Sequence, residues 1–303
     1  MPILVIYRVC SLKILLMSNI KSSLPFLIKM NIAIVDIGSN AIKYKIFDSK
    51  FNLVEYYRHP LRLGRDVFSN GYLEQNTINE VIQLLEKYLN IFIEKEIVEH
   101  HFIATSALRD CKNSRELLSL LKDKNISVRI ISGDTEAALL AEYNKNIKNS
   151  AVIDIGGGSV EVCINSENKI YTKSFQLGAV RLLNMSPDSK IAALNEFKFW
   201  LSQFSNINHI YGLGGNLRAL MQVNALESVM DGSNFKHHVD KYLKVPEEEL
   251  VSKHNIPKDR IDIIPEALNL YQLIINQLQS MKIENTFWSI SDGLVKKIVK
   301  GQL

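Results

Sequence analysis

The sequence has 303 residues, of which 47% are apolar and 22% are charged, so it is long enough for two globular domains with sizeable cores. Four basic residues and no acidic one stand in residues 1–29, and they account for the whole formal net charge of +4. The balanced charge of the remainder does not indicate a nucleic-acid partner. The three cysteines lie far apart without a C-x-x-C pair, which excludes a disulfide framework and favours a cytoplasmic location.

Residues 1–29 contain short apolar stretches that are broken by Arg8, Lys13 and Lys21. No apolar run reaches the roughly 18–20 residues that span a bilayer, so we expect no membrane segment. A targeting or membrane-surface segment is the second interpretation of this stretch, and whether it belongs to the mature protein is left open. We expect residues 1–29 to be an N-terminal extension outside the packed fold.

Hydrophobic periodicity predicts an order of elements that occurs twice along the chain. In the first half we expect strands and helices in the order βββαβαβα, at 31–36, 42–48, 52–58, 77–97, 100–104, 114–123, 126–131 and 133–146. In the second half we expect elements at 150–155, 159–165, 169–175, about 188–205, 208–212, about 215–224, 259–279, 285–290 and 291–300. The residues around 225–260 are predicted to be an irregular excursion.

Short sequence matches in the same order support an internal duplication. The matching pairs are IVDIGSN at 34–40 with IDIGGGS at 153–159, FIATSALR at 102–109 with YGLGGNLR at 211–218, and ISGD at 131–134 with ISDG at 290–293. Two facing units of this order resemble the actin, Hsp70 and sugar-kinase architecture, an α/β fold of two RNase H-like domains around a cleft. We therefore predict actin-like domains at 30–148 and 149–303.

Two glycine-rich turns are the first candidates for a ligand site, and each follows an aspartate, Asp36 or Asp154, at a strand end. Glycine allows close approach of the backbone to a ligand, and consecutive amide groups in such a turn suit phosphate oxygens. The aspartates can hold Mg²⁺, or they can cap their own turns. The predicted phosphate-binding residues of these and the related third turn are Gly38, Ser39, Asn40, Gly156, Gly157, Gly158, Ser159, Gly214 and Gly215.

Three charged residues stand beside these turns. Glu161 shares a strand face with Ser159, so its side chain can point toward the cleft. Arg109 follows a small-residue turn and suits bidentate phosphate binding. Glu136 lies in the first turn of a predicted helix, where an acidic residue also stabilises the helix dipole, so its position alone leaves both interpretations open.

Six segments resemble, in order, the signature blocks of the exopolyphosphatase / guanosine-pentaphosphate phosphatase family over residues 31–300. They are DIGSNAIKYKIFD, FIATSALRD, ISGDTEAALLAEY, VIDIGGGSVEV, FQLGAVRL and GLGGNLRAL. The resemblance implies that Glu136 is the catalytic base, that Glu161 also serves catalysis, and that Arg109 contacts phosphate. It further implies that Asp36 and Asp154, with Glu161, place Mg²⁺.

The sequence departs from the family pattern at three positions near the predicted site. Ala41 and Lys43 stand where the family usually has serine and arginine, and Asn216 replaces a hydroxyl residue. These changes leave open whether long polyphosphate or guanosine pentaphosphate is the substrate. A chain longer than the cleft would need a local basic track, for which we consider Lys43, Lys45, Arg62 and Arg65.

The predicted function is Mg²⁺-dependent hydrolysis of a terminal phosphoanhydride of polyphosphate or guanosine pentaphosphate, by a protein that could form a homodimer. Two alternatives from other classes remain at this stage. One is a kinase or ATPase of the same fold, and the other is a binding or regulatory protein with a degenerate site. Glu136 and Glu161 argue against the degenerate site because both acids are present.

Overall fold

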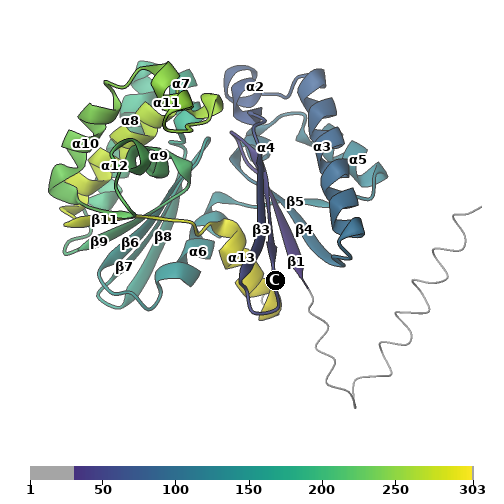
Figure 1. Cartoon of the computed structure of the whole chain (residues 1–303), viewed down its shortest axis with the longest axis horizontal. Helices are drawn as coiled ribbons and strands as arrows, with labels where there is room; N and C mark the ends of the chain where they lie inside the picture. Colours follow the sequence, from purple (N-terminus) through teal and green to yellow (C-terminus); the bar gives the residue numbers. More distant parts are fainter. Residues whose placement is uncertain (1–30, 302–303) are drawn as a thin grey trace, which may run out of the picture. The chain divides into compact units, whose positions relative to one another are not determined.

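Two β-sheets, each built from one half of the chain, form the framework of the protein (Figure 1). The computed structural model describes residues 31–301, so the predicted extension at 1–29 lies outside the described residues. The strands of the first sheet are β1 (Ile32–Ile37), β2 (Ile42–Phe47), β3 (Leu53–His59), β4 (Glu99–Ala104) and β5 (Val128–Ile130). Those of the second are β6 (Ser150–Ile155), β7 (Val160–Ser166), β8 (Lys169–Phe175), β9 (His209–Leu213), β10 (Val229–Asp231) and β11 (Lys282–Thr286).

The two sheets have the same topology. The first has the order β3-β2-β1-β4-β5, and the second, read from its β8 edge, has the order β8-β7-β6-β9-β11 followed by β10. In each sheet the first strand pairs antiparallel with the second and parallel with the fourth. The duplicated, RNase H-like α/β fold predicted from the sequence is therefore confirmed, with β10 as an added antiparallel edge strand.

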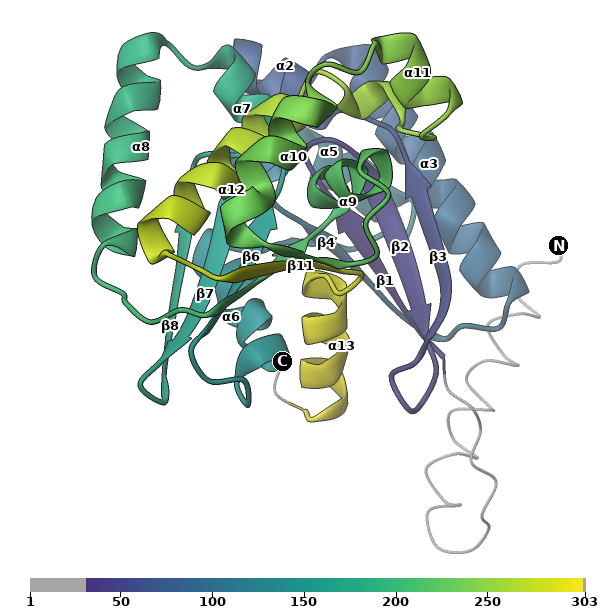
Figure 2. The same cartoon turned by 60° about the vertical axis from the view of Figure 1, so that its left-hand side comes forward.

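Helices cover both faces of the sheets (Figures 1 and 2). Those of the first half are α2 (Leu63–Asn70), α3 (Gln75–Glu94), α4 (Ser106–Asp110), α5 (Ser114–Asp123) and α6 (Gly133–Asn144). Those of the second half are α7 (Ala179–Asn184), α8 (Pro187–Leu201), α9 (Gly215–Val223), α10 (Phe235–Tyr242), α11 (Glu247–Ser252), α12 (Ile264–Leu278) and α13 (Ile290–Val299). In α3, buried Ile78, Val81, Leu85, Tyr88 and Phe92 recur at spacings of three and four, which places one apolar stripe on the sheet.

The strand predicted at 285–290 is wrong in position, since β11 ends at Thr286. Phe287 and Trp288 extend the apolar pattern in the sequence, but Ser289 already caps the next helix. Its backbone and its side chain both bond to Asp292 in a capping box that begins α13.

The helix predicted from residue 259 begins only at Ile264, because Pro265 occupies its first turn. The preceding residues form a short 3₁₀ turn, Lys258–Arg260. The excursion at 225–260 was predicted to be irregular but contains β10, α10 and α11. The sequence analysis also missed α2, α4 and α7, which are too short to show an amphipathic period.

Two helices each pack against the sheet of the other half of the chain. The helix α6 follows the first sheet in sequence but packs against β6, β7 and β8 of the second, while α13 follows the second sheet and packs against β1. A buried apolar core between the sheets joins them, with Ile34 and Val152 from the strands and Leu140 and Leu294 from the helices. The described residues thus form one compact unit, and the domain boundary predicted at 148/149 stays a prediction.

No helix within residues 31–301 is both long enough and apolar enough to span a bilayer.

The core around α6 and α13 predicts a large effect of one truncation. Leu140→Ala should lower the free energy of unfolding by about 2–5 kcal/mol, because Leu140 is fully buried between the two sheets. Leu243→Ala, at a leucine that is 53% exposed, should cost less than about 1 kcal/mol. Urea unfolding of both variants measures the difference, and equal losses would mean that the core does not join the sheets.

Candidate active site

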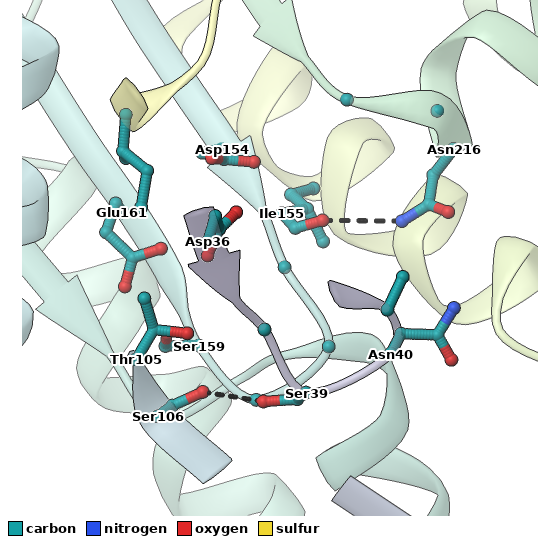
Figure 3. A pocket seen from close by; sticks show the side chains of 18 of the residues that line it. Asp36, Ser39, Asn40, Thr105, Ser106, Asp154, Ile155, Ser159, Glu161 and Asn216 are labelled. Carbon is teal, nitrogen blue, oxygen red and sulfur yellow. Dashed lines mark hydrogen bonds between the residues drawn. The ribbon is translucent and has the colours of Figure 1, made fainter. Parts of the chain in front are cut away.

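One cavity of about 90 Å³ opens where the ends of the central strands meet, and it gathers nearly all of the predicted site residues (Figure 3). Its walls include Asp36, Gly38, Ser39, Asn40, Glu136, Asp154, Gly156, Gly157, Gly158, Ser159, Glu161, Gly214 and Gly215. Segments following residues 36, 105, 132, 154 and 213 contribute, as the repeated topology predicts, and Ile290 at the start of α13 completes the wall. Arg109 stands behind this wall and reaches the cavity through Glu136.

The two glycine turns approach each other closely across the cavity. A Cβ atom on Gly158 would lie 2.1 Å from the Ser106 hydroxyl, so only glycine fits at this point. The hydroxyl groups of Ser39 and Ser106 lie 2.9 Å apart beside it (Figure 3). In the described part of the chain, the amide groups of Ser39, Asn40, Gly157 and Gly158 donate to no backbone or side-chain acceptor. Unused amide groups on two facing turns form a concave site for an anion.

The two hairpins differ in charge at one equivalent pair of positions. In the first, Asp36 lies opposite Lys43, whose Nζ donates to Asp36 Oδ2 at 3.3 Å. In the second, Asp154 lies opposite Glu161, so two carboxyl groups are cross-strand neighbours. Like charges directly opposite each other on a sheet are destabilising unless something offsets them.

Burial and mutual repulsion raise the pKa values of the carboxyl groups in this cluster. Burial, followed by the charge of Asp154, raises the pKa of Glu161, although Ser174 donates a 2.8 Å hydrogen bond to its Oε1. Burial also raises the pKa of Asp154. Carboxyl groups with such raised pKa values in a cavity mark a candidate functional site.

Glu136 lies in the first turn of α6, which Ser132 caps by accepting from the Thr135 amide at 3.1 Å. The side chain is buried, and Arg109 Nη1 donates to Glu136 Oε1 at 2.6 Å. Burial and then the charge of Glu161 raise the pKa of Glu136, and Arg109 opposes this rise. Arg109 Nη2 is buried and has no hydrogen-bond partner among residues 31–301, so one donor of the guanidinium is unused.

The donor set fits a hard divalent cation such as Mg²⁺. Asp36 Oδ1 is buried without a hydrogen-bond partner in the described chain, and Asp154 and Glu161 stand in the same wall. No three histidine, cysteine, aspartate or glutamate side chains of residues 31–301 come together as a complete metal site. Mg²⁺ usually takes only one or two protein carboxylates and keeps waters and substrate oxygens, so this arrangement suits it.

The sequence analysis missed one residue of the cavity wall, Arg260. Its guanidinium lies against Gly215, where a Cβ atom would meet Nη1 at 2.2 Å, and Nη1 donates to Asn216 Oδ1 at 3.3 Å. Burial, and then the charge of Arg58, lowers the pKa of Arg260 to about 10. Arg260 has no carboxylate within ion-pair distance in residues 31–301, so this partly buried cation is available to an anionic ligand. It comes from the excursion at 225–260, which has no counterpart in the first half to draw attention to it.

Two of the four residues considered for a basic track bind carboxylates of the protein and are poorly accessible. Lys45 is buried, and its Nζ donates to Asp292 at 2.6 Å. Arg62 forms a bidentate ion pair with Asp262. Only Lys43 and Arg65, whose side chains are 35% and 72% exposed, remain accessible.

The raised carboxyl pKa values predict how the stability of the metal-free protein depends on pH. Above the ordinary glutamate pKa, folded Glu161 binds a proton that the unfolded chain releases, so stability falls as pH rises through the raised value. Glu161→Gln should therefore raise the melting temperature more at about pH 9 than at about pH 6. Glu227→Gln, at an exposed glutamate, is the control. A melting temperature that changes equally at both pH values would contradict the raised pKa.

Known proteins resemble this chain in sequence. Residues 44–301 match the model of the Ppx/GppA phosphatase family. The bifunctional 3-dehydroquinate synthase/phosphatase of Fusobacterium nucleatum is 29% identical over 231 residues, which are 66% of this chain and 35% of that protein. Exopolyphosphatase 1 of Mycobacterium tuberculosis is 28% identical over 165 residues, which are 50% of this chain and 48% of that protein. The chain thus spans about a third to a half of the length of these two relatives.

Solved structures show the same fold. A crystal structure of an exopolyphosphatase from Cytophaga hutchinsonii has a TM-score of 0.78 at 21% identity, over 89% of this chain and 98% of that one. The Ppx/GppA family member of Aquifex aeolicus has a TM-score of 0.71 at 23% identity, over 90% and 99%. Since the family model covers most of the chain and solved members share its fold, this chain belongs to the Ppx/GppA phosphatase family.

Proposed function

We propose that this chain removes the terminal phosphate of inorganic polyphosphate, or of guanosine pentaphosphate, by hydrolysis with Mg²⁺ as cofactor. One observation carries the proposal: the Glu136 carboxylate, held by Arg109, opens on the same cavity as the unused amide groups of both glycine turns. A base, a guanidinium and amide donors around one small space are the elements that phosphoryl transfer to water requires.

The two turns bind the terminal phosphate in this proposal. Its oxygens accept hydrogen bonds from the amide groups of Ser39 and Asn40 on one side and of Gly157 and Gly158 on the other. Arg109 Nη2, which is unused in the described chain, donates to the same phosphate while Nη1 keeps its bond to Glu136. Arg109 thereby fixes the distance between the phosphate and the base.

Glu136 orients a water molecule in line with the terminal phosphoanhydride and accepts its proton. The water oxygen forms a bond to the terminal phosphorus, and the bond from that phosphorus to the bridging oxygen breaks. The shortened chain leaves with the electron pair of the broken bond. A carboxylate whose pKa is raised by burial is a stronger base than an ordinary glutamate, provided that it is unprotonated when substrate binds.

Asp36 and Asp154, with Glu161, would hold Mg²⁺ at the strand ends. When bound, the cation offsets negative charge on phosphate oxygens and on the leaving group. Asp154 and Glu161 lie opposite each other in the second hairpin, so a cation beside them also relieves their repulsion. The relatives named exopolyphosphatase make inorganic polyphosphate the first substrate to assay.

Removing the proposed base tests its role. Glu136→Gln should lower kcat by roughly 10²–10⁴, the range expected for loss of a general base, and should not lower the melting temperature at neutral pH, because burial raises the pKa of Glu136 and makes its charged form costly. Phosphate release from polyphosphate measures kcat. Glu142→Gln, the same change on the same helix away from the cavity, should turn over like the parent. Near-normal turnover of Glu136→Gln would remove Glu136 from this role.

The proposed cation site predicts altered metal dependence. Asp154→Asn and Glu161→Gln should raise the Mg²⁺ concentration for half-maximal activity at least several-fold, because each removes a charge beside the cation. Asp240→Asn, at an exposed aspartate of α10, should not. Mg²⁺ titration of the phosphate-release rate makes the comparison. Curves that overlay the parent's curve would show that these two carboxylates do not serve the metal.

A further inference from the structure

Arg62, the residue before α2, has all three guanidinium nitrogens engaged, two of them with the second half of the chain. Nη1 and Nη2 donate to the two Asp262 carboxylate oxygens at 2.6 and 2.8 Å, and Nη2 also donates to the backbone carbonyl of Asp259. Nε donates to Asn40 Oδ1 at 2.7 Å. Arg62 therefore connects the first glycine turn, which carries Asn40, to a segment about 200 residues away in the sequence.

A second ion pair fastens the same segment. Both terminal nitrogens of Arg58 on β3 donate to the Asp259 carboxylate. Asn40 Nδ2 also donates to Asp259 Oδ2 at 3.1 Å. The segment 258–262 of the second half is thus held on the first half at β3 and at the first glycine turn.

Arg260 lies between the two aspartates and points into the cavity instead. Its Nη1 donates to Asn216 Oδ1, and Asn216 Nδ2 donates to the carbonyl of Ile155 at the start of the second glycine turn (Figure 3). One line of contacts therefore runs from the first turn through Arg62, the segment 258–262 and Asn216 to the second turn. This line of contacts links the two turns in addition to their direct packing on each other.

We propose that Arg62 is a positioning residue for this site. With Arg58, Asp259 and Asp262 it forms a latch that holds the two glycine turns and Arg260 around one cavity. The latch stands near α2, at the end of the molecule away from α6 and α13, whose core joins the sheets (Figure 2). The kinetic consequences of the latch rest on the proposed phosphohydrolase function, whereas its structural consequences do not.

The latch is suited to opening and closing. The Arg62 and Asp262 side chains are 20% and 51% exposed, and ion pairs with such access to water are individually weak. When the latch opens, the fraction of molecules that can bind substrate falls, and the apparent affinity falls by the same factor. Bound substrate restores the closed arrangement, so a broken latch should raise KM more than it lowers kcat.

The sequence suggests another role for Arg62, as part of a basic track that binds polyphosphate. For the variant Asp262→Asn, this role and the latch predict different changes in KM. If Arg62 bound polyphosphate, Asp262→Asn would release it from its partner and lower KM or leave it unchanged. If Arg62 acts through the latch, Asp262→Asn should raise KM as Arg62→Ala does. Arg62→Lys, which keeps the charge but loses the bidentate fork, should also behave like Arg62→Ala.

The test measures phosphate release from polyphosphate by the full-length protein. We expect Arg62→Ala and Asp262→Asn each to raise KM about two- to fivefold, the factor that a weak ion pair supports, with a smaller change in kcat. The double variant should be no worse than Arg62→Ala alone, because that change already removes the contact that Asp262→Asn breaks. Lys258→Ala is the matched control, since it removes a positive charge from an exposed residue of the same segment. It should keep the parent's KM.

Hydrogen–deuterium exchange of the substrate-free protein tests the latch without an activity assay. Arg62→Ala and Asp262→Asn should each speed exchange in the segment 258–264, and Lys258→Ala should not. A parent protein that releases no phosphate would defeat the proposed function, while this exchange result would still test the latch. Unchanged exchange in both latch variants, a KM for Asp262→Asn that is equal to or lower than the parent's, or additive losses in the double variant would each overturn the latch.

Discussion

This site depends on one constraint: several carboxyl groups are crowded into a space that is largely closed to water. Asp154 lies opposite Glu161 on one hairpin, and Glu136 and Asp36 stand in the same cavity wall. Arg109 offsets part of this charge and Lys43 another part, but the pKa values of both glutamates and of Asp154 remain raised. The arrangement costs stability in the metal-free protein, and in the proposed function a cation and an anionic ligand that bind together offset this cost.

The duplicated fold explains why such unlike groups meet. Both halves deliver a strand end and a turn with unused amide groups to the same place, so a phosphate can be held from two sides. The halves then differ at one cross-strand position, where the first has Lys43 and the second has Glu161. In the proposed function, the symmetric backbone binds the phosphate and the asymmetric side chains perform the chemistry.

The exchange of helices places the base at the junction of the two halves. Glu136 begins α6, which follows the first sheet but packs on the second, and its partner Arg109 belongs to α4 of the first half. A rotation of one half relative to the other would therefore change the Arg109–Glu136 contact. In the closed arrangement seen here, Glu136 and both turns line one cavity and the Arg109 guanidinium lies behind Glu136, and we propose that the contacts of Arg62 with Asp262 hold this arrangement closed.

Local sequence patterns predicted the parts of this site that depend on local structure. Asp36 and Asp154 could be placed because an apolar strand, an acid and a small-residue turn occur twice, and Glu161 because strand side chains alternate. Arg260 could not be found, since it stands in an excursion without a repeated counterpart. The partners of Arg62 could not be found for a similar reason: no local pattern shows that Asp259 and Asp262, about 200 residues away, already bind its guanidinium, so its role in a basic track stays a prediction.

The most direct test of the account follows the oxygen of the attacking water. The protein would hydrolyse a short polyphosphate of defined length in ¹⁸O-labelled water with Mg²⁺, and mass spectrometry would examine both products after brief reaction. Attack by water on the terminal phosphorus predicts one labelled oxygen in the released phosphate and none in the shortened chain. Label at the new end of the chain, or no phosphate release at all, would contradict the proposed attack in this cavity.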